Sequence, residues 1–139
     1  MSLPELDMDH EGASCVLVVE DEVLVRMAVA DELREAGLIV IEAKNADKAL
    51  QVIESGTAVD LIFSDVQMPG SMDGAELAWR VMKSHPEILV ILTSGNVQAE
   101  TVSNLTRFLP KPYTVGFARR VILNELEGAN RCHRSKSTF

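Results

Sequence analysis

The sequence predicts an α/β fold in which helices pack against a parallel β-sheet. Three observations support this fold class. The chain has a length that suits one domain, short apolar segments recur along it, and segments with apolar residues at helical spacing separate them. Strands and helices that alternate in this way form a parallel sheet with right-handed crossover connections.

Five apolar segments have the composition of strands. The first, CVLVV, is a continuous apolar run of the kind expected for a central parallel strand that is covered on both faces. Polar residues follow most of these segments immediately. The expected strands are residues 15–19, 38–43, 60–64, 88–93 and 107–110.

Helices are expected between these strands. The first covers residues 23–36, with an apolar stripe that begins at Leu24 and Met27. The second is capped by Asn45 and ended by Gly56. Apolar stripes also mark the third helix (Leu77, Ala78, Val81, Met82) and the last helix (Val115, Ala118, Ile122, Leu126).

One further helix, within residues 97–105, is expected to be short and marginal. This segment is rich in Thr, Ser, Asn and Val, which have modest helix propensity. A weak helix at this place suggests that order is gained there on partner binding.

The composition limits the class of protein. The 139-residue chain is 47% hydrophobic and 24% charged, as in soluble globular domains. Its net charge of -8 argues against direct nucleic-acid binding, because phosphate backbones are bound mainly by clustered Lys and Arg. No apolar run approaches the roughly 20 residues of a membrane-spanning helix, and no signal peptide is recognisable. We therefore expect a cytoplasmic protein that does not enter a membrane.

Composition also suggests the extent of the domain. Residues 1–13 are polar and acidic and are expected to form a mobile leader. Residues 128–139 carry a few basic residues among Ser and Thr and are expected to be a disordered tail. The folded domain is therefore expected over residues 14–127.

Polar residues follow several of the predicted strands at the point where each strand ends. They are Glu20 and Asp21 after the first, Asp65 after the third, Thr93 at the end of the fourth and Lys111 after the fifth. The carboxyl ends of parallel strands meet at one edge of the sheet, where α/β proteins bind ligands. Carboxylates gathered there repel one another unless a cation is present, and Mg²⁺ suits such oxygen-rich sites.

The same residue types suit phosphoryl transfer. A metal, a lysine and a hydroxyl group next to a carboxylate are the groups needed to move a phosphoryl group onto that carboxylate. Asp65 is the candidate nucleophile, while Lys111 and Thr93 are candidate ligands of the phosphoryl oxygens. Each of these residues alone also has an ordinary explanation as a turn or cap residue. Their joint occurrence at four strand ends favours the site.

Four motifs carry a family resemblance: VLVVEDE, IFSDVQMPGSMDG, ILTSG and FLPKPY. In this order and at about this spacing they resemble the receiver domain of two-component response regulators, over residues 14–127. The resemblance implies a flavodoxin-like, doubly wound (βα)5 sheet with strand order 2-1-3-4-5. It also implies a signalling switch phosphorylated on Asp65 by a histidine kinase or a phosphotransfer protein. Such a protein catalyses only its own phosphorylation and dephosphorylation.

The resemblance further assigns roles to individual residues. It implies that Asp21, Asp65 and the backbone carbonyl of Gln67 bind Mg²⁺, with Glu20 acting through a water molecule. Thr93 and Lys111 are implied to contact the phosphoryl group.

The aromatic residue that many family members use as a rotameric switch corresponds to Phe108, for which plain core packing is an equal alternative. Tyr113 is a second candidate for the surface that contacts a partner.

The chain departs from the family pattern in one loop. Two residues, Gly70 and Ser71, stand between Met-Pro and Met-Asp-Gly, where one is common. Because Gln67 precedes the extra residue, we expect the metal site to be intact.

The output and its alternatives follow from the length of the chain. The 12 residues after Glu127 are too few for an output domain. The expected output is therefore contact with a downstream protein target, by a monomer or a phosphorylation-dependent dimer. Alternatives are a receiver fragment of a hybrid histidine kinase or of a DNA-binding response regulator. A phosphatase of the haloacid dehalogenase type is less favoured, since it needs an acid at the position of Gln67.

Overall fold

The chain forms one five-stranded parallel sheet. The computed structural model describes residues 12–95 and 107–137, with side chains up to residue 129 in the last helix. The strand order is β2-β1-β3-β4-β5, as the family resemblance implies. The strands are β1 (Cys15–Val19), β2 (Ile39–Ala43), β3 (Leu61–Asp65), β4 (Leu89–Ser94) and β5 (Arg107–Pro110).

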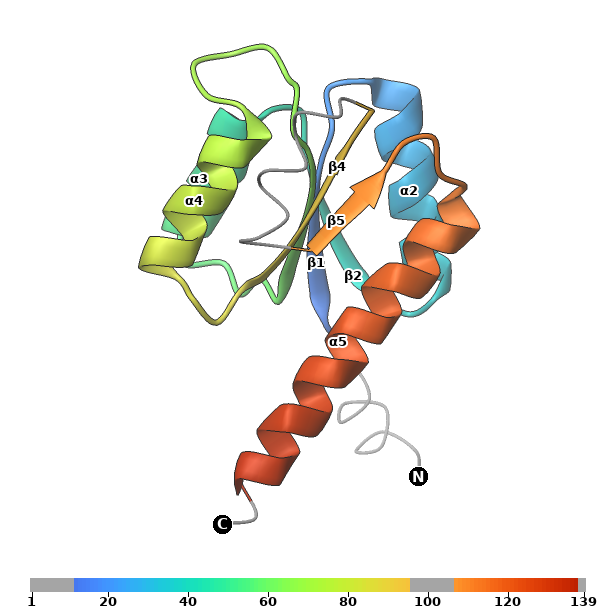
Figure 1. The fold of residues 1–139 in the computed structure, drawn as a ribbon, viewed down its shortest axis with the longest axis vertical. Coiled ribbons are helices and arrows are strands. Elements are labelled where there is room, and N and C mark those ends of the chain that lie inside the picture. Colours follow the sequence, from blue (N-terminus) through green and yellow to red (C-terminus); the bar gives the residue numbers. More distant parts are fainter. Residues whose placement is uncertain (1–11, 96–106, 138–139) are drawn as a thin grey trace, which may run out of the picture.

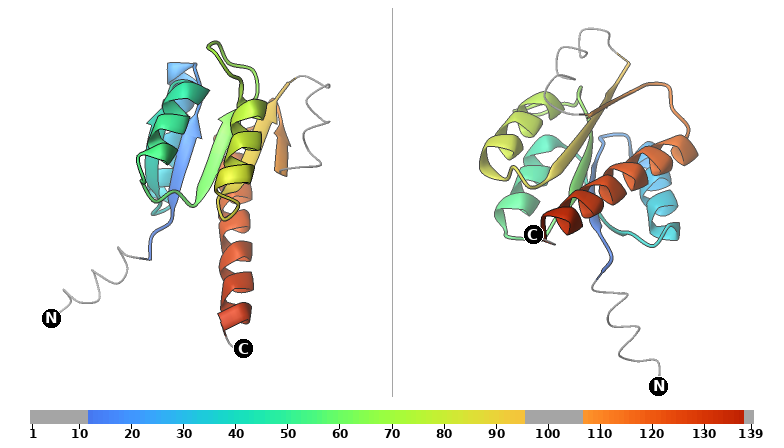
Figure 2. Two further views of the ribbon diagram at one scale, coloured as in Figure 1. Left: turned by 90° about the vertical axis from the view of Figure 1, so that its left-hand side faces the viewer. Right: turned by 60° about the horizontal axis from the view of Figure 1, so that its bottom comes forward.

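Helices cover both faces of the sheet. Figures 1 and 2 show α3 and α4 on one face, and α2 and α5 on the other. Within the described residues, no helix is both long and apolar enough to cross a bilayer. The helices are α2 (Val23–Glu35), α3 (Ala46–Glu54), α4 (Gly74–Ser84) and α5 (Val115–Ser137).

Two apolar cores lie on the two faces of the sheet. Alternate residues of a strand point to opposite faces, so Val16 and Val18 join the core under α2 and α5, while Leu17 and Val19 join the core under α3 and α4. All five residues of β1 and of β3 are buried. This burial fixes the strand register and therefore the positions of the residues at the strand ends.

Local sequence signals set the helix boundaries. Asn45 caps α3, because its side-chain Oδ1 accepts a hydrogen bond from the backbone N–H of Lys48 at 2.8 Å. Asp73 caps α4 in the same way, with the N–H of Glu76 at 2.9 Å. Gly56, with φ of 88°, follows α3 in a conformation that favours glycine.

The first helix, α2, does not bury all of the apolar residues that the sequence pattern placed on one face. Val29, Ala30 and Leu33 are buried, whereas Leu24 is 81% exposed and Met27 is 46% exposed. The predicted apolar stripe was therefore wrong in its first turn. The reason is that α2 begins at the carboxyl edge of the sheet, where no other described element covers it.

The last helix is longer than expected. α5 continues through residues 128–137, where we expected a disordered tail, and Figure 1 shows it extending past the sheet. Residues 128–137 contain no proline, and extending a helix that packing already holds costs far less than starting one. Residues 1–11 of the predicted leader and the predicted helix in 97–105 lie outside the described residues.

Candidate functional site

The acidic loop after β1 is held by backbone contacts. The N–H of Glu20 donates to the carbonyl of Ala43 at 3.1 Å, which places the start of the loop against the end of β2. The Glu20 side chain is turned inward and only 5% exposed. Its Oε2 accepts a hydrogen bond from the N–H of Glu22 at 3.2 Å. Asp21, between them, is exposed.

Asp65 is the last residue of β3, whereas the sequence predicted it to be the first residue after that strand. It pairs in register with Thr93 of β4, and Asp65 as a whole is only 6% exposed. Lys111, directly after β5, donates from Nζ to Asp65 Oδ2 at 2.9 Å. The same ammonium lies 4.0 Å from Glu20 Oε1. One cation therefore faces both buried carboxylates.

Three carboxylates meet at this edge of the sheet. One oxygen each of Glu20, Asp21 and Asp65 lie within 4.8 Å of one another, close enough to hold one metal ion. Two of the three are buried, so the donor set consists of oxygen atoms partly withdrawn from water. Carboxylate oxygens in this arrangement fit a hard divalent cation.

The charges of this cluster alter its titration. Burial raises the pKa of Glu20 to about 7, and the negative charge of Asp65 adds to this effect. Burial lowers the pKa of Lys111, but its hydrogen bond to Asp65 and the surrounding negative charges outweigh burial, so the pKa is raised. Lys111 is therefore an ammonium ion at neutral pH.

Thr93 brings a hydroxyl group to the same place. It is 1% exposed, and its Oγ1 has no hydrogen-bond partner among the described residues. A buried hydroxyl without a partner has a free-energy cost that a ligand with a free acceptor or donor atom relieves. Since Thr93 lies beside Asp65, that ligand atom would belong to a group bound at Asp65.

The remaining predicted residues lie around this centre. Gln67 is exposed and lies in the loop just after β3, so its role as a carbonyl ligand stays a prediction. Phe108 is half-buried and packs against the core under α3 and α4, so its switch role likewise stays a prediction. The Lys111–Pro112 peptide is cis.

Tyr113 is half-buried, and its role as a surface that contacts a partner stays a prediction. Its ring contacts Phe63 edge to face, with 5.8 Å between the centroids. Burial, together with the charges of Glu20 and Asp65, raises the pKa of Tyr113 to about 12. It is therefore neutral and belongs to the wall of the site.

Two positioning residues were missed from the sequence. Gly74 is the first residue of α4, and a Cβ atom there would overlap the backbone carbonyl oxygen of Asp65. Its N–H donates to the carbonyl of Val66 at 2.8 Å. The Met-Asp-Gly motif contains this glycine, but only the packing of α4 against the end of β3 explains it.

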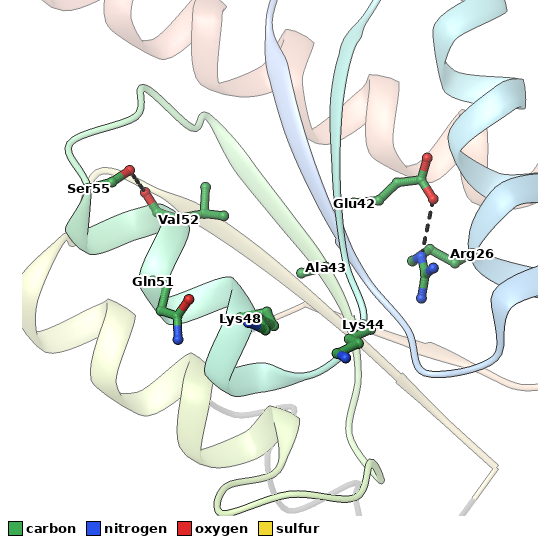
Figure 3. A pocket seen from close by; sticks show the side chains of 8 residues that line it. All are labelled: Arg26, Glu42, Ala43, Lys44, Lys48, Gln51, Val52 and Ser55. Carbon is green, nitrogen blue, oxygen red and sulfur yellow. Dashed lines mark hydrogen bonds and ion pairs between the residues drawn. The ribbon is translucent and has the colours of Figure 1, made fainter.

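Arg26 is the second missed residue. From α2 it donates to the backbone carbonyl of Glu20 at 2.9 Å and to Glu42 Oε1 at 3.1 Å. Figure 3 shows Arg26 and Glu42 next to each other in the lining of a pocket that Lys44 and Lys48 also line. Arg26 thus ties the acidic loop to β2. In the sequence, Arg26 stands among the apolar residues of the first half of α2, and this pattern gives no signal for the contact.

An apolar groove borders the site on one side. It has a volume of about 660 Å³ and runs from Lys111 past Pro112 and Tyr113 to the first turns of α2. Leu24, which is 81% exposed, is its most exposed large apolar side chain. The apolar side chains that the first turn of α2 leaves in solvent therefore lie next to the carboxylate cluster.

The extra residue of the loop after β3 has a partner. The Ser71 hydroxyl donates to Asp47 Oδ1 in the first turn of α3 at 2.6 Å. The Ser71 N–H lies 3.3 Å from Asp47 Oδ2. The loop is therefore connected to α3.

Comparisons with known proteins agree with this geometry. The sequence profile described as the response regulator receiver domain matches residues 16–115. Sensor kinase CckA of Brucella abortus is 40% identical over 113 residues, covering 77% of this chain and 12% of that protein. The transcriptional regulatory protein PdtaR of Mycobacterium tuberculosis is 32% identical, over 83% of this chain and 58% of that protein. The chain thus spans only part of the length of these curated relatives.

Solved structures show the same fold. NtrX of Brucella abortus is 30% identical with a TM-score of 0.82, over 91% of this chain and 30% of that one. The response regulator TrrA of Thermotoga maritima, solved in complex with Mg(2+)-BeF, is 26% identical with a TM-score of 0.72, over 80% of this chain and 97% of that one. With these matches and the strand-end cluster, the chain belongs to the response regulator receiver domain family.

Proposed function

We propose that this chain is a phosphoacceptor switch and that Asp65 receives the phosphoryl group from a histidine kinase or a phosphotransfer protein. The observation that carries the proposal is the set of charged and polar groups around Asp65. Its carboxylate lies beside two further acids, an ammonium ion 2.9 Å away and, in register on the next strand, a buried hydroxyl that has no partner among the described residues. Each of these groups matches a requirement of phosphoryl transfer to a carboxylate.

The proposed reaction forms one bond and breaks one bond. A carboxylate oxygen of Asp65 attacks the phosphorus while the bond between phosphorus and the donor's histidine nitrogen breaks, and the electron pair of that bond stays on the nitrogen. Mg²⁺, held by Glu20, Asp21, Asp65 and the Gln67 carbonyl, would neutralise charge on the transferred group. The chain would catalyse only this transfer and the later hydrolysis.

Lys111 and Thr93 would respond to the new group. The Lys111 ammonium now bonds to Asp65 Oδ2, and a phosphoryl oxygen offers it a more strongly charged acceptor. Thr93 Oγ1, which has no partner among the described residues, would donate to a second phosphoryl oxygen. Both movements change the surface at the ends of β4 and β5, where a downstream protein would bind.

Labelling with a small phosphodonor tests the proposal. Incubation with acetyl phosphate and Mg²⁺ is expected to add one phosphoryl mass, which hydroxylamine removes because it cleaves acyl phosphates. Asp65→Asn should abolish the adduct. Intact-protein mass spectrometry measures both results.

Asp73→Asn is the matched control for this experiment. It alters another carboxylate of the same loop, but asparagine retains the capping oxygen of α4. This variant should be labelled like the wild type. An unlabelled wild-type chain, or an adduct that survives in Asp65→Asn, would contradict the proposal.

We further propose that the phosphodonor protein binds at the apolar groove beside Lys111. The groove leads from the exposed first turn of α2 to the carboxylate cluster. A donor that buries Leu24 would bring its histidine toward Asp65. Large exposed apolar side chains next to a reactive group are typical of a protein-binding surface.

Leu24→Glu tests this surface. It is expected to lower the rate of transfer from a histidine kinase that phosphorylates the wild-type chain by about ten-fold, while labelling by acetyl phosphate is unchanged. Trp79→Glu is the control, because Trp79 is also exposed but lies on α4. Equal rates for Leu24→Glu and the wild type in radiolabel transfer assays would exclude this surface.

A further inference from the structure

The loop between β3 and α4 is fixed at both ends. At its start the N–H of Val66 donates to the carbonyl of Thr93 at 3.0 Å, and at its end the N–H of Gly74 donates to Val66 at 2.8 Å. Val66 and Met72 are each 7% exposed and belong to the core under α3 and α4. Between them, Gln67 is exposed, so its position depends on other contacts of the loop.

Asp47 supplies such contacts. Its two carboxylate oxygens accept from the hydroxyl and the N–H of Ser71, at 2.6 and 3.3 Å respectively. Two hydrogen bonds from one residue to one carboxylate fix orientation as well as distance. We call this pair of contacts the Asp47–Ser71 clasp.

Gly70 shows how closely the loop approaches Asp47. A Cβ atom at Gly70 would lie 3.1 Å from Asp47 Oδ2, closer than most such contacts. Gly70 also has φ of 124°, a conformation that favours glycine. The two residues where the loop is longer than the family pattern are thus both fitted to the same carboxylate.

We propose that Asp47 is a positioning residue for the metal site, acting through the Asp47–Ser71 clasp. The clasp fixes the loop that carries Gln67, whose carbonyl would bind the metal together with Asp21 and Asp65. This inference rests on the proposed function, in which that carbonyl is a Mg²⁺ ligand. The longer loop needs the clasp because an additional residue adds backbone freedom that must be removed when the metal binds.

A simpler role for Asp47 must be separated from this one. Asp47 lies in the first turn of α3, where a negative charge stabilises a helix on its own. That role needs no serine. A loss of metal affinity on changing Ser71 therefore identifies the clasp, whereas a loss on changing Asp47 alone does not.

The experiment measures Mg²⁺ binding to the unphosphorylated chain by titration calorimetry. Ser71→Ala and Asp47→Ala are each expected to weaken binding by roughly three- to ten-fold, the effect of losing a charge-assisted hydrogen bond. The double variant should bind Mg²⁺ no more weakly than Asp47→Ala, because Asp47→Ala already removes both hydrogen bonds of the clasp, including the hydroxyl bond that Ser71→Ala removes. Ser71→Thr keeps the hydroxyl and should bind like the wild type. Amide exchange at residues 67–72 should become faster in Ser71→Ala.

Ser55→Ala is the matched control. Ser55 follows α3 at its other end, is exposed, and its hydroxyl donates to the carbonyl of Val52 at 2.7 Å, as Figure 3 shows. This variant loses two exposed serine hydroxyl contacts of similar length, with the Val52 carbonyl and with the Thr57 hydroxyl at 2.8 Å, and should leave the Mg²⁺ affinity unchanged.

The outcomes separate the inference from the proposed function. If the wild type binds Mg²⁺ and Ser71→Ala binds it equally well, the clasp is not a positioning device, while the phosphoacceptor proposal is unaffected. If the losses of Mg²⁺ affinity in the two single variants add up in the double variant, the clasp proposal would also be overturned. If the wild type does not bind Mg²⁺, both proposals fail.

Discussion

Replacing Gly74 with alanine is expected to lower the free energy of unfolding by about 3 kcal/mol or more and to prevent phosphorylation of Asp65. The added Cβ would overlap the carbonyl oxygen of Asp65 and lie 2.9 Å from its carbonyl carbon and 3.0 Å from the Cα of Val66. All three are backbone atoms at the end of a buried strand, so they cannot move without displacing Asp65. Urea denaturation and acetyl phosphate labelling measure the two effects.

Gly116→Ala provides the control. Gly116 lies in the first turn of α5, and a Cβ atom there would meet nothing within 4 Å. Alanine in a helix is favoured over glycine by roughly 0.5–1 kcal/mol, so this variant should be as stable as the wild type or slightly more stable. Equal stability of Gly74→Ala and Gly116→Ala would contradict the close packing of α4 on β3.

The second large effect is a loss of stability with rising pH in the metal-free protein. The folded state holds the pKa of Glu20 at about 7, above its ordinary value of 4.5. Between these values the folded chain keeps a proton that the unfolded chain has released, so the free energy of unfolding falls as pH rises. The expected fall from pH 4.5 to above 7 is on the order of 2 kcal/mol.

Glu20→Gln isolates this contribution from that of other titrating groups. The amide cannot ionise, so the difference between wild type and variant should change with pH only within this window. Denaturation in EDTA from pH 4 to 8 measures it, and Mg²⁺ should reduce the fall because the metal favours the ionised carboxylate. Parallel pH profiles for the two proteins would show that Glu20 titrates normally.

Much of the fold is predictable from local sequence. The predicted ends of the five strands lie within one residue of the observed ends, since each strand is an apolar segment bounded by polar or turn residues. The carboxylate cluster was also predictable, because residues at the carboxyl ends of parallel strands must meet at one edge. The structure brings Glu20, Asp21, Asp65, Thr93 and Lys111 together there.

Other features depend on contacts between distant segments. The first turn of α2 is apolar in sequence yet exposed, because an apolar pattern does not say whether another element covers it. The length of α5 was missed for a related reason: polar composition resembles that of a disordered tail, whereas a helix already held by packing continues through it.

The sequence by itself determined which side chains stand at the carboxyl edge of the sheet and that Asp65 lies among them. Alternation of strands and helices fixes these positions locally. Only the tertiary structure decided how they are held, with Gly74 against Asp65, Arg26 on Glu20 and Asp47 on Ser71. These contacts join residues that are near in space through packing of separate helices on the sheet, and no local periodicity encodes such pairs.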